Sequence, residues 1–157
     1  MYALRCTRKR TAIQGGSFVA LGYLGFHPGE GVFSYTLAGQ PPPMVRRQSG
    51  TVECLEMPNH RLPLGAMRVG GHKMMECVLD TGDLIVAYSD GVVEAQSPEG
   101  EFFGEDRLAE ALAESPADPQ EAVNFLVGEI EAFTCGHTPY DDVTLLAASW
   151  SPDGGSA

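Results

Sequence analysis

The sequence has no run of apolar residues near the roughly 20 that a membrane-spanning helix requires. Its first residues are partly basic, but neither an apolar core nor a cleavage site of a secretory signal follows them. Its four cysteines form no C-x-x-C pair, so their spacing encodes neither a zinc cluster nor a disulfide framework. The composition, 43% hydrophobic and 20% charged over 157 residues, is that of one globular domain. We therefore expect a cytoplasmic protein with reduced thiols and no membrane partner.

Basic residues are almost absent from the second half of the chain. Residues 1–75 carry nine basic and three acidic side chains, whereas residues 76–157 carry eighteen acidic side chains and one basic, Arg107. The formal net charge of −11 therefore divides into +6 and −17. Such a field repels nucleic acid phosphates and attracts cations or a basic partner surface. We expect no nucleic-acid binding.

Turn residues divide most of the first half into short β-rich segments. Residues 1–17 show neither alternation nor a helical stripe, and we expect them to form a loose N-terminal arm. Two hairpins are predicted, one from residues 18–26 and 32–37 and the other from residues 44–47 and 51–55.

A third hairpin is predicted from residues 74–79 and 84–88. The intervening Asp80-Thr81-Gly82-Asp83 offers the glycine that a tight turn commonly needs. The second of these strands begins Leu84-Ile85-Val86-Ala87 and is apolar on both faces. A strand without alternation is covered on both sides, so we expect it to lie centrally in a sheet with another layer over each face.

Two helices and a final strand are predicted in the second half. The first helix covers about residues 105–114, and the second runs from Pro119 to about Phe133, with Asp118 as its N-cap and Gly136 at its end. Residues 143–148 form the last buried strand. The apolar stripe of the second helix is predicted to be Val123, Leu126, Val127 and Ile130.

Two acidic motifs flank apolar strands. Asp90 follows the predicted central strand in a Ser-Asp-Gly turn, and Asp141-Asp142 precede the last strand. If the two strands are neighbours, we expect the side-chain oxygens of Asp90 and Asp141 within about 6 Å, where they could share one Mg²⁺ or Mn²⁺ ion. The alternative is that each aspartate caps its own turn, which is the commoner use of Asp-Gly.

Five segments match one known family in order and spacing, over about residues 18–148. They are Thr36-Leu37-Ala38-Gly39-Gln40-Pro41-Pro42-Pro43, Leu62-Pro63-Leu64-Gly65, the stretch from Leu79 to Glu94, Phe103-Gly104, and Asp141-Asp142-Val143-Thr144. Together they resemble the metal-dependent PPM-type protein serine/threonine phosphatases, specifically the stage II sporulation protein E-like branch of bacteria. The resemblance implies an α+β fold, a partial four-layer α/β/β/α sandwich with antiparallel sheets and two C-terminal helices. Residues 18–150 would form the phosphatase domain and residues 151–157 a flexible tail.

The resemblance also implies a binuclear Mn²⁺ or Mg²⁺ centre between the sheets. Asp90 and Asp141 match the metal-binding aspartates of the family, and Gly91, Asp142 and Thr144 match supporting positions. No side chain is the nucleophile in this scheme, because a metal-activated water attacks the phosphorus. The implied activity is hydrolysis of phosphoserine or phosphothreonine on a bacterial regulatory protein, such as an anti-sigma-factor antagonist.

The chain departs from the family pattern in two places. It lacks the N-terminal half, whose Gly-Asp or Asp-Gly motif bridges both metals, and neither Asp153-Gly154 nor Gly82-Asp83 lies where it can substitute. Gln40 stands where the family usually has a histidine. We therefore expect a truncated or mis-started chain that is inactive or nearly so by itself. The alternatives are a catalytically degenerate interaction module of the same fold and a fragment without an independent fold.

Overall fold

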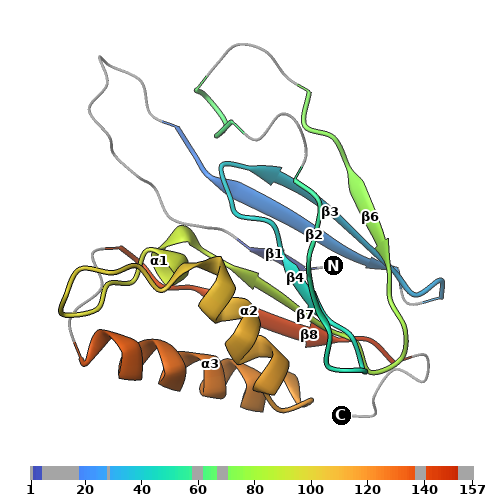
Figure 1. The fold of residues 1–157 in the computed structure, drawn as a ribbon. Coiled ribbons are helices and arrows are strands. Elements are labelled where there is room, and N and C mark those ends of the chain that lie inside the picture. Colours follow the sequence, from blue (N-terminus) through green and yellow to red (C-terminus); the bar gives the residue numbers. More distant parts are fainter. Residues whose placement is uncertain are drawn as a thin grey trace.

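The computed structural model describes residues 2–4, 18–27, 29–57, 62–66, 71–136 and 141–151. Most of the expected N-terminal arm, the Asp153-Gly154 pair and all but the first residue of the expected tail lie outside these ranges. The described residues form two antiparallel four-stranded sheets and three helices (Figure 1). The predicted α+β class with antiparallel sheets is confirmed.

The first sheet has the strand order β1-β2-β3-β6. Its strands are β1 (Tyr2–Leu4), β2 (Leu21–His27), β3 (Val32–Ala38) and β6 (Met75–Val78). The predicted hairpin of β2 and β3 is confirmed, with His27 opposite Val32 beside the turn. The expectation of a loose arm is wrong for residues 2–4, which pair with β2. The edge of β2 would otherwise present unpaired backbone groups, and this short strand satisfies part of that edge.

The second sheet has the strand order β5-β4-β7-β8. Its strands are β4 (Met44–Arg46), β5 (Val52–Cys54), β7 (Leu84–Tyr88) and β8 (Leu145–Ser149). The predicted hairpin of β4 and β5 is confirmed. β7 lies between β4 and β8, which confirms its predicted central position.

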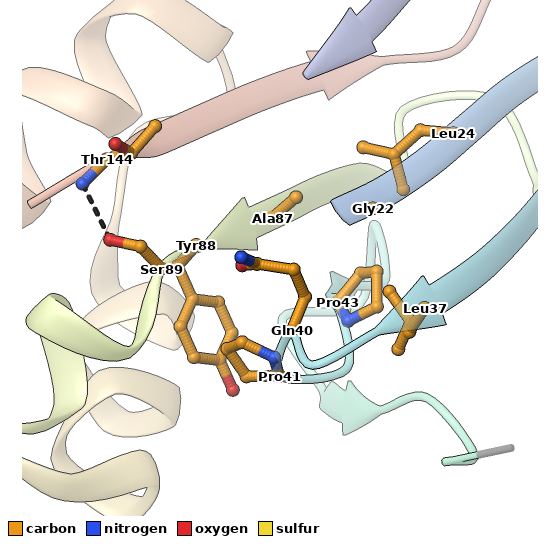
Figure 2. Close-up of a pocket in the computed structure, with 10 residues that line it drawn as sticks. All are labelled: Gly22, Leu24, Leu37, Gln40, Pro41, Pro43, Ala87, Tyr88, Ser89 and Thr144. Carbon is orange, nitrogen blue, oxygen red and sulfur yellow. Dashed lines mark hydrogen bonds between the residues drawn. The ribbon is translucent and has the colours of Figure 1, made fainter. Parts of the chain in front are cut away.

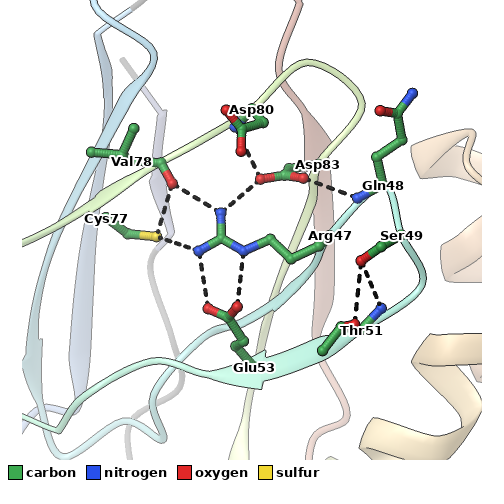
Figure 3. A network of polar contacts seen from close by, with 9 residues as sticks. All are labelled: Arg47, Gln48, Ser49, Thr51, Glu53, Cys77, Val78, Asp80 and Asp83. Atoms are coloured by element: carbon green, nitrogen blue, oxygen red, sulfur yellow. Dashed lines mark hydrogen bonds and ion pairs between the residues drawn. The ribbon is translucent and has the colours of Figure 1, made fainter.

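The predicted hairpin of β6 and β7 is wrong, because these two strands belong to different sheets. The turn between them carries the chain from one sheet to the other. The Asp83 carboxylate in this turn is 1% exposed and accepts hydrogen bonds from the backbone N–H groups of Asp80 and Gln48, each at 3.0 Å. It also pairs with the Arg47 guanidinium at 2.7 Å (Figure 3). The turn is therefore held against the β4–β5 connection rather than closing a hairpin.

β7 contributes to two hydrophobic clusters, because successive side chains of a strand point to opposite faces of its sheet. Leu84, Val86 and Tyr88 pack toward the helices. Ile85 packs between the two sheets, in the cluster that contains Phe33 of β3. The predicted layer on each face of β7 is thus confirmed. In the part of the chain that the structure describes, the helices cover only the second sheet, so three of the four expected layers are seen.

The helices are α1 (Asp90–Val93), α2 (Gly104–Glu114) and α3 (Pro119–Thr134). α2 and α3 confirm the two predicted helices, whereas α1 was not predicted, since four residues show no helical period. The predicted N-cap of α3 is confirmed, because Asp118 Oδ1 accepts hydrogen bonds from the backbone N–H groups of Gln120 and Glu121. No helix among the described residues combines the length and apolar composition needed to cross a membrane.

The predicted apolar stripe of α3 is only partly right. The residues that α3 buries are Ala122, Leu126, Ile130 and Thr134. Val123 and Val127 are half-buried, because the helix is rotated so that a neighbouring line of side chains faces the sheet. The helix ends at Thr134, close to the predicted end at about Phe133; its C-cap is Cys135, with a left-handed φ of 50°, and Gly136 follows with a φ of 76°.

Candidate metal centre

Two acidic turns emerge at the same edge of the second sheet, where β7 ends and β8 begins. The antiparallel pairing of the two strands reaches Tyr88 and continues one residue further, because the backbone N–H of Ser89 donates to the Thr144 carbonyl at 3.0 Å. Asp90 follows Ser89 directly, and Asp141-Asp142 lie just before Thr144. The structure therefore brings the two predicted aspartate motifs to one place.

The Ser89 hydroxyl ties the two turns together. It donates a hydrogen bond to the Asp142 carbonyl at 2.9 Å. It accepts one from the backbone N–H of Thr144, also at 2.9 Å, which Figure 2 shows. Ser89 is 2% exposed and occupies the N-cap position of α1, but its side chain makes no capping bond there. Sequence reasoning did not assign this residue to the site. The available signal was a serine that ends a buried strand immediately before an Asp-Gly pair.

Gly91 lies in direct contact with the backbone of the other turn. A Cβ atom at this position would lie 2.5 Å from the Asp142 carbonyl oxygen and 3.3 Å from the Asp141 carbonyl oxygen. Real Cβ atoms do not approach other atoms so closely. Gly91 is therefore required by the close approach of two chain segments, and its supporting role in a metal site stays a prediction.

Each aspartate carboxylate is oriented by its own turn in the same way. Asp90 Oδ1 accepts a hydrogen bond from the backbone N–H of Gly91 at 3.1 Å, and Asp141 Oδ1 accepts one from the backbone N–H of Asp142 at 2.9 Å. These bonds are the ones that the turn-capping alternative predicts. They are also compatible with metal binding, because an ionised carboxylate has about four lone-pair sites. The role of Asp90 and Asp141 as metal ligands stays a prediction.

The chemistry of the donors fits a hard divalent cation. Asp90 and Asp141 are half-buried and Asp142 is exposed, so solvent reaches the edge where the two turns meet. Carboxylate, carbonyl and water oxygens are the ligands that Mg²⁺ and Mn²⁺ prefer. Among the described residues no three or more histidine, cysteine, aspartate or glutamate side chains gather around one point. The described part of the chain thus offers a pair of carboxylates to such an ion.

A small cavity opens between the two sheets beside these turns. Its volume is about 30 Å³, and it is lined by Ser89 and Thr144 on the side of the second sheet (Figure 2). Gln40 and Pro41, which follow β3, line it on the other side. The departure from the family pattern at Gln40 therefore lies next to the candidate site.

A sequence model described as stage II sporulation protein E matches residues 5–151. The chain belongs to this family. The curated Protein IcfG of Synechocystis sp. is 27% identical over 156 residues, which comprise 92% of this chain and 23% of IcfG. The chain thus spans about a quarter of the length of this stage II sporulation protein E relative.

Solved structures share the fold. The SiaA-PP2C domain of Pseudomonas aeruginosa matches with a TM-score of 0.71 and 19% identity, over 86% of this chain and 53% of that one. The RsbU and RsbW domains of Rv1364c from Mycobacterium tuberculosis match with a TM-score of 0.61 and 29% identity, over 83% and 35%. The phosphatase domain of SpoIIE from Bacillus subtilis matches with a TM-score of 0.67 and 17% identity, over 88% and 58%. The fold is therefore that of the PPM-type phosphatase domains, as the resemblance implied.

Proposed function

We propose that this chain forms part of the catalytic domain of a metal-dependent protein phosphatase. Its substrate is phosphoserine or phosphothreonine on a bacterial regulatory protein, such as an anti-sigma-factor antagonist. The observation that carries the proposal is the contact between the Asp90-Gly91 and Asp141-Asp142 turns, in a chain of the stage II sporulation protein E family. The shared fold with the phosphatase domain of SpoIIE and with the PPM Ser-Thr phosphatase MsPP of Mycobacterium smegmatis supports it.

In this proposal Asp90 and Asp141 hold Mn²⁺ or Mg²⁺ between the two turns. A bound divalent cation would neutralise charge on the phosphoryl oxygens and activate water for attack on phosphorus. Other residues of this chain hold the two aspartate turns in place. Gly91 lets the turns approach, and Ser89 fixes their spacing through its bonds to Asp142 and Thr144. No side chain of the chain acts as nucleophile.

Two carboxylates on separate loops bind one cation tightly only when the loops are held in place. A metal site loses affinity when its ligands must be ordered at the moment of binding. Residues that hold the ligands by hydrogen bonds commonly change the metal affinity 10- to 100-fold. The Ser89 hydroxyl donates one hydrogen bond and accepts another, and it is nearly inaccessible to solvent, so it links the two turns without any cation. The alternative of a catalytically degenerate interaction module is not favoured by any comparison with known proteins.

The first experiment is a Mn²⁺ titration of the chain by calorimetry. We expect Asp90→Asn and Asp141→Asn each to lower the affinity by about tenfold or more, because each removes a charged oxygen ligand. Asp106→Asn on the exposed face of α2 is the matched control and should bind as the unaltered chain does. Equal Mn²⁺ affinity in Asp90→Asn and the control would remove the proposed ligand role.

The second experiment measures phosphate release from a phosphoserine peptide with Mn²⁺, with a phosphotyrosine peptide for comparison. It is run on the chain and on any longer natural polypeptide that contains it. In whichever of these polypeptides releases phosphate, we expect the release to depend on Mn²⁺ and on Asp90 and to favour phosphoserine. Release that persists in Asp90→Asn would contradict the proposed mechanism.

A further inference from the structure

α3 carries large apolar side chains that the core covers only in part. Leu126 and Ile130 face the second sheet and are 0% and 5% exposed. Phe125 lies about 100° around the helix from Leu126 and Phe133 about 20°, and both pack against the core cluster but are only half-buried. Two large aromatic side chains therefore keep part of their apolar surface open to solvent at the edge of the core.

These phenylalanines line a groove between α2 and α3. Its volume is about 560 Å³, and Ala111 of α2 adds to its apolar floor. The Arg107 guanidinium lies 4.9 Å from the centre of the Phe133 ring, so the start of α2 lies beside the end of α3. The groove therefore runs along the full length of α2, which is roughly 16 Å for its 11 residues.

The rim of the groove is acidic. Glu110, Glu114 and Glu129 line it, and no described basic side chain forms an ion pair with any of them. Arg107 also lines the groove, at the end where α2 begins, and its charge is paired there with Glu101. Its guanidinium donates to the Phe102 and Phe103 carbonyls and pairs with Glu101. The groove thus combines an apolar floor with an excess of negative charge, since three carboxylates line it against one guanidinium that already pairs with Glu101.

We propose that this groove binds a cationic amphipathic helix of a partner protein. A helix that lays an apolar face into a groove uses residues at i, i+4 and i+7, which span about 10.5 Å and fit within the length of α2. Lysine or arginine beside this face would meet Glu110 and Glu129 on opposite rims. The strong charge asymmetry of the chain selects the same kind of partner, since residues 76–157 carry −17.

The acidic rim also argues against other occupants of the groove, namely a second copy of the chain, nucleic acid and anionic lipid. A second copy of the chain docked by a two-fold axis would place glutamate rims against each other, and like charges in contact are repulsive. Nucleic acid and anionic lipid are repelled by the same groups. This inference is independent of the proposed phosphatase activity, because none of its residues lies at the candidate metal centre.

The test is calorimetric titration of the chain with a synthetic helical peptide. The peptide has about 18 residues, with leucines at i, i+4 and i+7 and lysines on both flanks, which is long enough for some helix in water. A peptide of the same composition with its leucines scrambled is the control for non-specific attraction. We expect the amphipathic peptide to bind at least about tenfold tighter than the scrambled one, and more weakly at high salt.

Charge reversal of the rim is the decisive variant. Glu110→Lys combined with Glu129→Lys should weaken peptide binding by about tenfold or more, since it turns attraction into repulsion. Glu76→Lys combined with Glu99→Lys makes the same change in net charge at exposed positions outside the groove and should retain most of the binding. Equal binding by both double variants, equal binding of both peptides, or self-association of the chain through the groove would each overturn the proposal.

Discussion

The backbones of Gly91 and Asp142 lie so close that a Cβ atom at position 91 would sit 2.5 Å from the Asp142 carbonyl oxygen. That carbonyl also accepts the hydrogen bond from the Ser89 hydroxyl, so it cannot move away without losing a buried contact. The position of one acidic turn is therefore set by the absence of a side chain in the other. The arrangement of Asp90 relative to Asp141 depends on this contact.

Gly91→Ala should destabilise the chain and weaken Mn²⁺ binding together. The added methyl group meets backbone atoms rather than a flexible side chain, so the two turns must separate. Overpacking of this kind costs about 1–3 kcal/mol of unfolding free energy. Urea unfolding measures the stability, and a Mn²⁺ titration of the same sample measures the affinity.

Gly128→Ala is the matched control for this substitution. Gly128 is exposed on α3, and a Cβ atom there has no neighbour within 4 Å. Alanine is the better helix former, so we expect the stability to stay equal or to rise by up to about 1 kcal/mol. If Gly91→Ala behaved as Gly128→Ala does, the close contact would not constrain the turns.

Ser89→Ala should also destabilise the edge where the two acidic turns meet, through the loss of hydrogen bonds. The hydroxyl is the hydrogen-bond partner of the Asp142 carbonyl and of the Thr144 N–H. Its removal leaves these buried backbone groups with fewer partners, which costs about 1–3 kcal/mol. Ser49→Ala in an exposed turn should change the stability by no more than about 0.5 kcal/mol. Thermal unfolding of both variants, with and without Mn²⁺, checks the difference, and equal shifts would contradict it.

Local patterns predicted the elements of this fold well. The absence of alternation in Leu84-Ile85-Val86-Ala87 correctly indicated a strand covered on both faces. Asp118 correctly marked the start of α3, because capping depends on atoms two and three residues away. The aspartate motifs were placed at one edge by the assumption that their strands are neighbours, and the register of β7 and β8 confirms that assumption.

The features of the fold that local patterns did not predict depend on contacts between residues far apart in the sequence. Asp80-Thr81-Gly82-Asp83 has the composition of a hairpin turn, and Gly82 indeed has a φ of 88°. The flanking strands nevertheless enter different sheets, because Asp83 is held by Arg47 and Gln48, about 35 residues away. The role of Ser89 was hidden for the same reason, and Gly91 was assigned to the site only through the family resemblance. Their partner is Asp142, and no local periodicity reports a contact across 50 residues of chain.

Arg47→Met should lower the free energy of unfolding far more than a substitution of its exposed partner, Glu53. Arg47 pairs with Asp83, whose side chain is 1% exposed, and with Glu53, whose side chain is 47% exposed (Figure 3). Removing the cation leaves Asp83 buried with only two backbone donors, and breaking a buried pair costs about 3–5 kcal/mol. Glu53→Gln removes a surface pair and should cost at most about 1 kcal/mol. Urea unfolding compares the two, and similar losses would show that Asp83 does not depend on Arg47.

Asp83 should also make the stability of the chain depend on pH in the acidic range. Burial alone raises the pKa of this carboxyl, but the hydrogen bonds from the Asp80 N–H, the Arg47 guanidinium and the Gln48 N–H outweigh burial. The pKa of Asp83 therefore lies below its ordinary value of 3.8. Between the lowered and the ordinary pKa the unfolded chain binds more protons than the folded chain, so the free energy of unfolding rises with pH there.

The contribution of Asp83 is thus fully present above about pH 4 and is lost as the pH falls through its lowered pKa. Asp83→Asn removes the titrating group, and its amide N–H₂ would face donors that the carboxylate now accepts from. We expect the variant to be less stable at neutral pH and to lose less stability than the unaltered chain between about pH 5 and pH 2. Urea unfolding midpoints measured across this pH range give the pH dependence of stability for both chains. Parallel loss of stability in the two chains would mean that Asp83 does not titrate with folding.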